Sequence, residues 1–529
     1  MKPESVEILD TTLRDGAQAE GISFSVNDKF KIAELLSGIG IKYIEAGNPG
    51  SNPKDREFFN DFNKKCALKE YSSLAAFGST RRKGVSPEDD EGMANLVAAD
   101  TDTVVIFGKT WDREVLEILR CSLKENQEMI RDSVEYLTGL GKQVIFDAEH
   151  YFEAYISNPD YALDCLLAAQ EGGAYAVVLC DTNGASMPEQ IESCVKEAVM
   201  KLDCMVGIHC HNDSGMAVAN SLIAILAGAT HLQGTFNGIG ERCGNANLST
   251  LIPNLQIKYK IKCIPQENME NLTHVARAMA DISNMTLTGQ EPYIGTSAFS
   301  HKAGMHVDGV KKNSSTFEHI LPEMVGNSRR FLMSEISGRS SLIEVIKKYK
   351  PDIDKNSPDV TRILAKFKEM EHEGYHFEGA EASQELLICK ELHLYTPFFS
   401  LEKMRISGDL PLTGEFSATA FIKICVGKLN EVTASEGDGP VNAMDKALRK
   451  ALEVFYPEIK HIRLTDYKVR VISTQATASQ VRVLIESTDG NDIWSTIGVS
   501  TDILEASWIA LVDSLEYKLM KEKMCVKLI

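Results

Sequence analysis

This chain of 529 residues lacks the features that mark secreted, disulfide-rich and membrane proteins. Its twelve cysteines are scattered, form no Cys-x-x-Cys pair and often lie in apolar runs, so we expect reduced, mostly buried thiols and no disulfide scaffold. No run approaches the roughly 20 apolar residues that cross a bilayer. The N-terminus contains acidic residues and leads directly into a strand pattern, which is unlike a signal peptide. These absences predict a cytoplasmic protein without a membrane partner.

Positive charge is also scarce. The chain has 56 lysine and arginine residues against 75 aspartate and glutamate residues, which gives a formal net charge of −19. A nucleic-acid partner is not expected, because neutralising phosphates requires a basic surface. An anionic ligand must instead be held by local basic side chains or by backbone N–H groups.

The first half of the chain alternates short apolar runs with amphipathic helical segments. The runs are Val6–Leu9, Tyr43–Ala46, Leu74–Phe77, Thr103–Phe107, Gln143–Phe146, Tyr175–Leu179, Met205–Ile208 and His231–Phe236. Eight strands that alternate with helices predict a closed (β/α)₈ barrel, the TIM barrel of the α/β class. A doubly wound open sheet is the alternative, but no G-x-G-x-x-G motif opens a helix after an early strand.

Two changes of pattern divide the rest of the chain. We predict that the barrel spans residues 1–265, that helical linker subdomains span 266–382, and that a C-terminal α+β domain spans 383–529. The last part contains an internal repeat, because a strand-rich segment, a glycine-containing turn and a helix occur twice. The two turns lie at 437–441 and 498–502. Such a repeat can build a regulatory domain or a plain dimerisation domain.

Side chains suited to metal binding follow two of the predicted strands, at the end where barrel active sites lie. The seventh strand ends in His209 and His211, which point to the same face because they are two residues apart. Their Cα atoms should lie about 6.5–7 Å apart, a span that two imidazoles can close around one ion. Asp15, beside Arg14 after the first strand, can add a carboxylate, and Asn245 can add an amide oxygen. This mixed set suits Zn²⁺, Mn²⁺ and Mg²⁺, and the sequence does not choose among them.

Four other strand ends point into the same barrel mouth. Glu149 and Thr182 follow the fifth and sixth strands and are candidates for holding a substrate, although helix capping is an ordinary use of such residues. Phe77 and Phe107 end the third and fourth strands, where their bulk would narrow the pocket. Burial in the core is the commoner fate of phenylalanine.

Four motifs in this order resemble the 2-isopropylmalate, homocitrate and citramalate synthases. They are DTTLRDG at 10–16, HCHN at 209–212, GERCGN at 240–245 and SHKAGMHVDG at 300–309. Two further segments, EGISFS at 20–25 and IEAGNPG at 44–50, look most like the citramalate synthase branch. The resemblance extends over nearly the whole chain, and the C-terminal repeat looks like the allosteric amino-acid-binding domain of this family.

The resemblance implies an acyltransferase that performs a Claisen-type condensation. Acetyl-CoA, pyruvate and water would give citramalate and CoA, the first step of a pyruvate route to isoleucine, with a divalent cation (Mg²⁺, Mn²⁺ or Zn²⁺) as cofactor. The alternatives with the same chemistry are 2-isopropylmalate synthase, homocitrate synthase and an aldol-type lyase. Phe77 and Phe107 would favour pyruvate by excluding larger 2-oxo acids. A catalytically silent amino-acid sensor is disfavoured, because Arg14 and the metal-binding side chains are all present.

The resemblance also assigns roles to the barrel residues. Asp15, His209, His211 and Asn245 would bind the metal or lie beside it. Arg14 would stabilise the oxyanion that forms on the ketone. Thr182 and Glu149 would position the 2-oxo acid.

Further catalytic residues would come from the linker region. His306, together with Asp308, would assist deprotonation of acetyl-CoA in the site of the neighbouring subunit of a homodimer, and His301 is the weaker choice. The chain has Phe317 where relatives commonly have a tyrosine. If that hydroxyl assists proton transfer in relatives, water or another group must replace it here.

An amino acid is the expected effector of the C-terminal domain. Each repeat places a glycine-containing turn before a helix, whose free N–H groups suit an α-carboxylate. Gly439, Val441, Ala443, Ile503 and Ala506 lie at or beside these turns and could form a pocket for an aliphatic side chain. By the resemblance, isoleucine is the first choice and leucine the second.

Overall fold

The computed structural model describes residues 2–65, 68–302, 304–331, 339–354, 356–377, 379–408, 417–472, 479–490 and 492–526. They form two compact units. The barrel unit comprises Met1–Phe299 and His319–Arg329, and the second unit comprises Ser300–Glu318 and Arg330–Ile529. The domain boundaries that the sequence suggests at residues 265 and 382 stay predictions.

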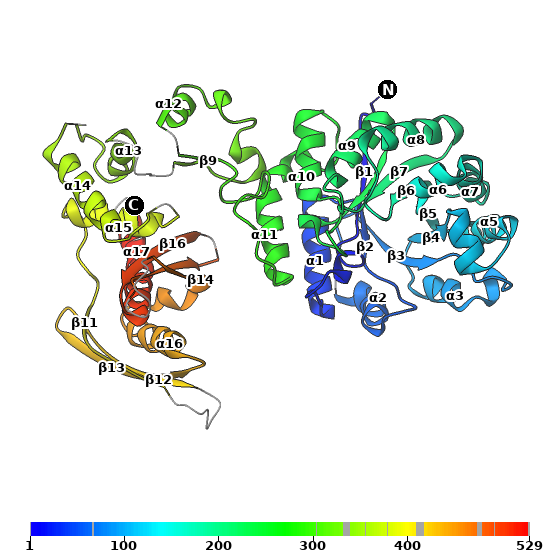
Figure 1. Cartoon of the computed structure of the whole chain (residues 1–529). Helices are drawn as coiled ribbons and strands as arrows, with labels where there is room; N and C mark the ends of the chain where they lie inside the picture. The colour runs from blue at the N-terminus through cyan, green and yellow to red at the C-terminus, as the bar shows by residue number, and fades with distance from the viewer. Residues whose placement is uncertain are drawn as a thin grey trace. The chain divides into compact units, whose positions relative to one another are not determined.

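Eight parallel strands close into a barrel in chain order (Figure 1). They are β1 (Glu7–Asp10), β2 (Tyr43–Glu45), β3 (Ser73–Ser79), β4 (Thr103–Lys109), β5 (Gln143–Glu149), β6 (Ala176–Asp181), β7 (Met205–Cys210) and β8 (His231–Gly234). Leu9 of β1 lies opposite Tyr43 of β2 on one side and Gln233 of β8 on the other, which closes the sheet. The predicted (β/α)₈ fold is confirmed.

Helices follow the strands and surround the barrel (Figure 1). They are α1 (Val26–Ile39), α2 (Pro53–Lys65), α3 (Glu91–Ala98), α4 (Asp112–Glu114), α5 (Leu123–Gly139), α6 (Tyr151–Ser157), α7 (Pro159–Glu171), α8 (Pro188–Lys201), α9 (Ala217–Ala227), α10 (Leu248–Pro253) and α11 (Leu272–Ile282). The ends of α1 show how the sequence sets its bounds. Ser25 and Asp28 form a capping box at its start, and Gly40, with a φ of 106°, ends it.

Side chains along each strand point alternately into the barrel interior and outward toward the helices. Leu9, Val105, Ile145 and Val178 fill the interior, whereas chain neighbours such as Ile8 pack with the helices. Toward the carboxyl ends of the strands, buried polar side chains replace the apolar ones. They include Glu45, Asp147, His209 and Gln233. The barrel therefore becomes polar at the end where an active site is expected.

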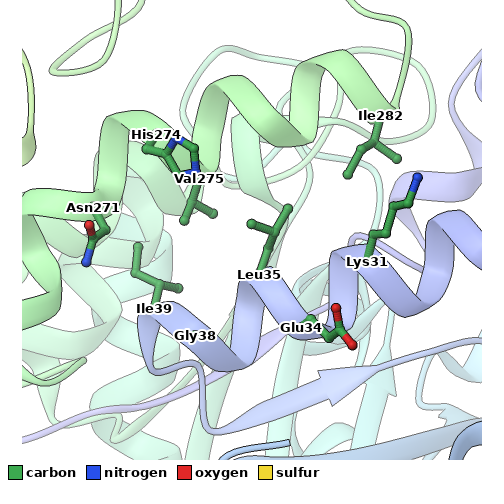
Figure 2. Close-up of a pocket in the computed structure, with 9 residues that line it drawn as sticks. All are labelled: Lys31, Glu34, Leu35, Gly38, Ile39, Asn271, His274, Val275 and Ile282. Atoms are coloured by element: carbon green, nitrogen blue, oxygen red, sulfur yellow. The ribbon is translucent and has the colours of Figure 1, made fainter. Parts of the chain in front are cut away.

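A groove of about 480 Å³ lies between α1 and α11 (Figure 2). Leu35 and Ile39 of α1 face Val275 and Ile282 of α11 across it. None of the residues that line this groove belongs to the site predicted from the sequence.

The first part of the second unit is mainly helical. Its elements are β9 (Ser300–His301), α12 (Gly304–Lys312), β10 (Arg330–Phe331), α13 (Arg339–Tyr349), α14 (Pro358–His372) and α15 (Glu381–Glu391). β9 and β10 form a short parallel pair. The helical character that the sequence predicts for this region is confirmed.

The second unit ends in two copies of one motif, three antiparallel strands followed by a helix. The first copy is β11 (Ser400–Gly408), β12 (Ala418–Val426), β13 (Leu429–Gly437) and α16 (Pro440–Leu452); the second is β14 (Arg463–Val471), β15 (Val481–Thr488), β16 (Ile493–Ser500) and α17 (Ile503–Val526). A Cβ atom on Gly437 would lie 2.4 Å from the Ala443 nitrogen, and one on Gly498 would lie 2.0 Å from the Ala506 oxygen. Both glycines thus allow the helix to approach its strand, and the predicted repeat is confirmed.

The structure bears on two expectations from the sequence, namely reduced cysteines and the lack of a membrane-spanning segment. Ten cysteines of the described residues have free thiols, and six of these cysteines are buried, as expected for small apolar side chains. Within the same residues, every helix is too short or too polar to cross a membrane.

Candidate active site

A cavity of about 280 Å³ opens at the carboxyl ends of the barrel strands. It is lined by Arg14, Asp15, Gln18, Phe77, Phe107, Asp147, Glu149, Cys180, Thr182, His209, His211, Glu241 and Arg242. These residues come from five of the strands, β3 to β7, and from the loops that follow β1, β6, β7 and β8. The structure therefore brings together most of the barrel residues that the sequence singles out.

The loop after β1 has a fixed shape that presents Arg14 and Asp15 to the cavity. Asp10 accepts hydrogen bonds from the backbone N–H and the hydroxyl of Thr12, both at 2.9 Å. The Thr12 hydroxyl in turn accepts a bond from the backbone N–H of Phe236 at 3.0 Å, which ties the loop to the chain after β8. Asp10 therefore holds the loop that carries the reactive side chains.

Asp15, His209 and His211 form one buried cluster, in which the possible ligand atoms lie within 4.8 Å of one another. The two histidine Nε2 atoms are 3.4 Å apart. Asp15 Oδ2 lies 3.2 Å from His209 Nε2 and 3.8 Å from His211 Nε2. Two nitrogens that bind the same tetrahedral ion, each at about 2.1 Å, lie about 3.4 Å apart. The cluster therefore fits a single divalent cation.

The charges of the cluster also suit a cation. Burial would raise the pKa of Asp15, but Arg14 and the two histidines outweigh it and hold that pKa well below its usual range. Burial and the neighbouring His209 lower the pKa of His211 to about 4. For His209, burial opposes protonation, but Asp15 outweighs it and raises the pKa. At neutral pH the cluster thus offers an ionised carboxylate and, at His211, a neutral imidazole.

Asn245 lies beside this cluster. Its Nδ2 donates to Asp15 Oδ2 at 2.7 Å and lies 3.3 Å from His209 Nε2. Its Oδ1 is buried, has no hydrogen-bond partner among the described residues, and is turned toward Gly240. Half a turn of the amide would exchange the two atoms and present the oxygen to the cluster. Its role as a metal ligand stays a prediction.

Arg14 is held between a carboxylate and an aromatic ring. Its Nε donates to Glu45 Oε2 at 2.6 Å, and its guanidinium carbon lies 3.9 Å from the centroid of the Phe77 ring. Burial would lower the pKa of Arg14, but Glu45 and Asp15 raise it more, so the guanidinium stays charged. The charge faces the same cavity as the Asp15–His209–His211 cluster.

Thr182 and Glu149 lie on neighbouring parts of the cavity wall. The Thr182 hydroxyl oxygen accepts a bond from the backbone N–H of His150 at 2.9 Å, so its own hydrogen can be donated to a ligand. Glu149 pairs with Lys109 at 2.7 Å. Asp181, by contrast, accepts bonds from the backbone N–H and hydroxyl of Ser186, which fits a structural role in its loop.

Phe77 and Phe107 form a wall of the cavity. Their rings stack with centroids 5.5 Å apart and an interplanar angle of 15°. Both side chains are half-buried and line the cavity. The bulk that the sequence predicts at this place is therefore present.

His306 and Asp308 lie on α12 in the second unit, and both are exposed. The His306 ring stacks on Phe317 with centroids 4.2 Å apart, and Asp308 pairs with Lys312 at 2.6 Å. His301 is buried and lies 3.0 Å from a carboxylate oxygen of Glu318, which suits a structural role. The catalytic roles of His306 and Asp308 stay predictions.

The proposed effector residues differ in their exposure. Val441 lines a cavity of about 580 Å³ together with Asn442, Asp445, Arg449, Ile462, Arg463, Leu464 and Tyr467. Gly439 lies two residues before Val441 and is the N-cap of α16. Among the described residues, no side chain caps this start of the helix. Ala443 and Ala506 are fully buried, Ile503 is exposed, and none of the three lines this cavity. Their contact with an effector stays a prediction.

Sequence patterns did not single out three residues that contact the site. Glu45 holds Arg14, Lys109 holds Glu149, and Gln233 lies 2.8 Å from His209. Glu45 and Gln233 interrupt apolar strand runs, and a buried polar side chain in such a run needs a partner. That interruption could have marked both. Lys109 ends a strand, where a charged residue is ordinary, and gives no such signal.

Family models match almost the whole chain. The model described as HMGL-like matches residues 5–279, just over half of the chain. The models "Homocitrate synthase post-HMGL domain-like" and "LeuA allosteric (dimerisation) domain" match residues 293–375 and 378–519. Each part of the predicted architecture therefore has a counterpart in one group of proteins.

Relatives of similar length carry two kinds of name. The chain is 51% identical to the (R)-citramalate synthase of Aquifex aeolicus, over 98% of this chain and 99% of that one, and 49% identical to the (R)-citramalate synthase of Geobacter sulfurreducens, over 98% of each. A protein of Methanopyrus kandleri named "Probable 2-isopropylmalate synthase" is 32% identical over 96% of this chain and 97% of its own. The chain therefore belongs to the HMGL-like family of enzymes and, within it, to the citramalate synthase branch of the 2-isopropylmalate and homocitrate synthases.

Proposed function

We propose that this chain condenses acetyl-CoA with pyruvate and water to give citramalate and CoA, in line with the names of its Aquifex and Geobacter relatives. The observation that carries the proposal is the single cavity in which Arg14 and the Asp15–His209–His211 cluster face two stacked phenylalanine rings. A second cavity of about 250 Å³ shares Arg14, Gln18 and Phe77 with the first. Two cavities that meet at Arg14 suit a reaction that joins two substrates.

The Asp15–His209–His211 cluster would hold the divalent cation, with the Asn245 oxygen as a fourth ligand. A cation bound there supplies Lewis-acid polarisation of the ketone. Its identity, Mg²⁺, Mn²⁺ or Zn²⁺, is open, because carboxylate, imidazole and amide ligands suit all three.

The chain's own residues would perform the remaining steps. Thr182 donates its hydroxyl hydrogen to the pyruvate carboxylate, and Glu149, held by Lys109, fixes the other side of the 2-oxo acid. When the acetyl methyl carbon attacks the ketone carbon, the ketone oxygen becomes an alkoxide, and Arg14 donates hydrogen bonds to it. Hydrolysis of the thioester by water then releases CoA and makes the sequence favourable.

The methyl group of acetyl-CoA is a weak acid and needs a base. We assign this step to His306, supported by Asp308, from the neighbouring subunit of a homodimer. Exposure of His306 on α12 and the match to a dimerisation domain support this assignment. The ring of Phe317 stacks on His306 and has no hydroxyl, so water or another group must carry any proton that a tyrosine would carry there.

The choice between two 2-oxo acids tests the proposed reaction. The chain should prefer pyruvate to 2-oxoisovalerate, because the bulk of the stacked phenylalanines should exclude a branched side chain. Phe107→Ala should raise kcat/KM for 2-oxoisovalerate relative to pyruvate by about 10-fold or more, since small changes in apolar bulk are worth about 1–3 kcal/mol. Steady-state kinetics that follow the free thiol of CoA measure this ratio for each acid.

Phe77→Ala is the matched comparison. Phe77 also supports the guanidinium of Arg14, so this variant should lose kcat with both acids, whereas Phe107→Ala keeps the turnover of pyruvate. Equal kcat/KM for the two acids in the unchanged protein would reject the citramalate assignment and favour 2-isopropylmalate synthesis.

The C-terminal repeat would regulate the barrel. We propose that isoleucine, or failing that leucine, binds in the cavity beside Val441, with its α-carboxylate at the uncapped start of α16. At the other helix, α17, Asp502 already accepts the backbone N–H of Leu504 at 2.8 Å. The start of α16 is therefore the more accessible of the two. Feedback by isoleucine fits an enzyme that opens a pyruvate route to this amino acid.

Isoleucine should bind the full chain and lower its rate, with a coupling of about 1–3 kcal/mol between effector and substrate. Calorimetry measures binding, and kinetics with and without isoleucine measure inhibition; alanine, which lacks the longer side chain, serves as the control ligand. Val441→Asp should weaken binding, while Val454→Asp, at an exposed valine just after α16, should not. If neither isoleucine nor leucine binds, or if binding leaves the rate unchanged, the repeat serves assembly alone.

A further inference from the structure

A chain of hydrogen bonds inside the barrel links His209 to a residue outside the predicted metal site. Gln233, on β8, is fully buried. Its Nε2 donates to Asp147 Oδ1 at 2.7 Å, and its Oε1 lies 2.8 Å from His209 Nδ1. The three side chains come from β5, β8 and β7, and two of them, Asp147 and His209, line the cavity.

The direction of each hydrogen bond follows from the atoms involved. The amide points its NH₂ group at Asp147, whose carboxylate oxygen accepts the hydrogen bond. The amide oxygen then faces His209, and because a carbonyl oxygen can only accept, Nδ1 of His209 must carry a hydrogen. A neutral imidazole has one N–H group, so the lone pair is on Nε2. That Nε2 faces Asp15 at 3.2 Å and His211 at 3.4 Å.

We propose that Gln233 is a positioning residue, which holds His209 in the tautomer whose Nε2 can bind the divalent cation. The inference rests on the proposed metal centre and adds a residue that does not touch the ion. A buried amide suits this task, because Asp147 fixes its orientation and its oxygen cannot donate. Without Gln233, the imidazole could place its hydrogen on Nε2 and block the ligand position.

The test uses the full-length protein and Mn²⁺ as the probe ion. Gln233→Met keeps the size of the side chain and removes both hydrogen bonds. It should weaken Mn²⁺ binding, measured by calorimetry, by about 10–100-fold, the usual effect of losing a partner of a metal-binding histidine. Gln233→Glu keeps an acceptor for Nδ1 and should restore affinity to within a few-fold of the unchanged protein, whereas a purely structural role predicts no such rescue.

Gln256→Met is the matched control. Gln256 is another buried glutamine of the barrel unit, and its side chain accepts the backbone N–H groups of Cys263 and Ile264 instead. This variant should lose thermal stability and keep its Mn²⁺ affinity. ¹⁵N NMR of the metal-free protein, at an alkaline pH at which His209 is neutral, gives a second readout, because the expected His209 signal is that of an Nδ1–H imidazole.

The outcomes separate this inference from the metal centre itself. An Nε2–H signal for the neutral His209 ring in the unchanged protein overturns the inference even if Gln233→Met does not fold. Equal Mn²⁺ affinity for the unchanged protein and a folded Gln233→Met also overturns it and leaves the metal centre standing. If the unchanged protein binds no divalent ion, the metal centre fails and this inference fails with it.

Discussion

Replacing His211 with alanine should lower kcat by about 10³-fold or more and leave the barrel folded. The loss follows because the divalent cation should be worth several kcal/mol to the transition state, and about 1.4 kcal/mol corresponds to a factor of ten. His211 is the better choice of the two histidines. Its Nδ1 has no hydrogen-bond partner in the described part of the chain, whereas removal of His209 would leave Gln233 without one of its partners.

His231→Ala is the control for loss of a barrel imidazole. His231 is fully buried at the amino end of β8 and lies opposite Glu7 and Gly207, so it has no contact with the Asp15–His209–His211 cluster. This variant should lose stability but bind the cation as before. Elemental analysis and calorimetry of both variants measure ion binding, and circular dichroism checks folding. Full activity of the unchanged protein after exhaustive chelation, with the absence of metal verified, would show that the reaction does not need a metal ion.

The barrel could be predicted from the sequence because its strands are buried on both faces. Runs such as Thr103–Phe107 and Tyr175–Leu179 are almost continuously apolar, and each is followed by a helical pattern. Eight such units leave few alternatives to a closed sheet. The Asp15–His209–His211 cluster could also be predicted, since His209 and His211 are two residues apart at the end of one strand and Asp15 follows a strand that closes the same barrel.

Contacts between distant strands could not be predicted in the same way. Glu45 meets Arg14 because β2 pairs with β1 in this register, and Gln233 meets both His209 and Asp147 because the closed barrel places β5, β7 and β8 around one interior. Which side chains meet there depends on register and on strand tilt. The sequence showed that these residues are polar and lie in strands, but it did not show their partners.

The residues predicted to bind the effector show a second limit of prediction from the sequence. Ala443 and Ala506 lie beside the glycine-containing turns, as expected, but they pack against Gly437 and Gly498. Small residues at these places let a helix approach a strand, so the same pattern serves packing and would equally serve ligand binding. Val441 differs from them because its side chain is partly exposed and lines a cavity.

Arg14→Lys should lower kcat by about 10²-fold or more with little change in the KM for pyruvate. The ketone oxygen gains its negative charge only in the transition state, so a donor aimed at it acts on kcat. Lysine keeps the charge but loses the planar fork. In the structure one arm of that fork, Nε, is bound to Glu45, and the stack on Phe77 fixes the plane of the rest. An ammonium group would instead be drawn to the Glu45 or Asp15 carboxylate and away from the ketone.

Arg81→Lys makes the same chemical change elsewhere in the barrel unit. Arg81 donates two hydrogen bonds to Asp132, at 3.2 and 2.6 Å, and neither residue lines the cavity. This control should alter stability and leave kcat unchanged. Initial rates at varied pyruvate concentration separate kcat from KM for both variants. A rise in KM with an unchanged kcat would show that Arg14 binds the substrate equally in the ground and transition states, and the oxyanion role would then be wrong.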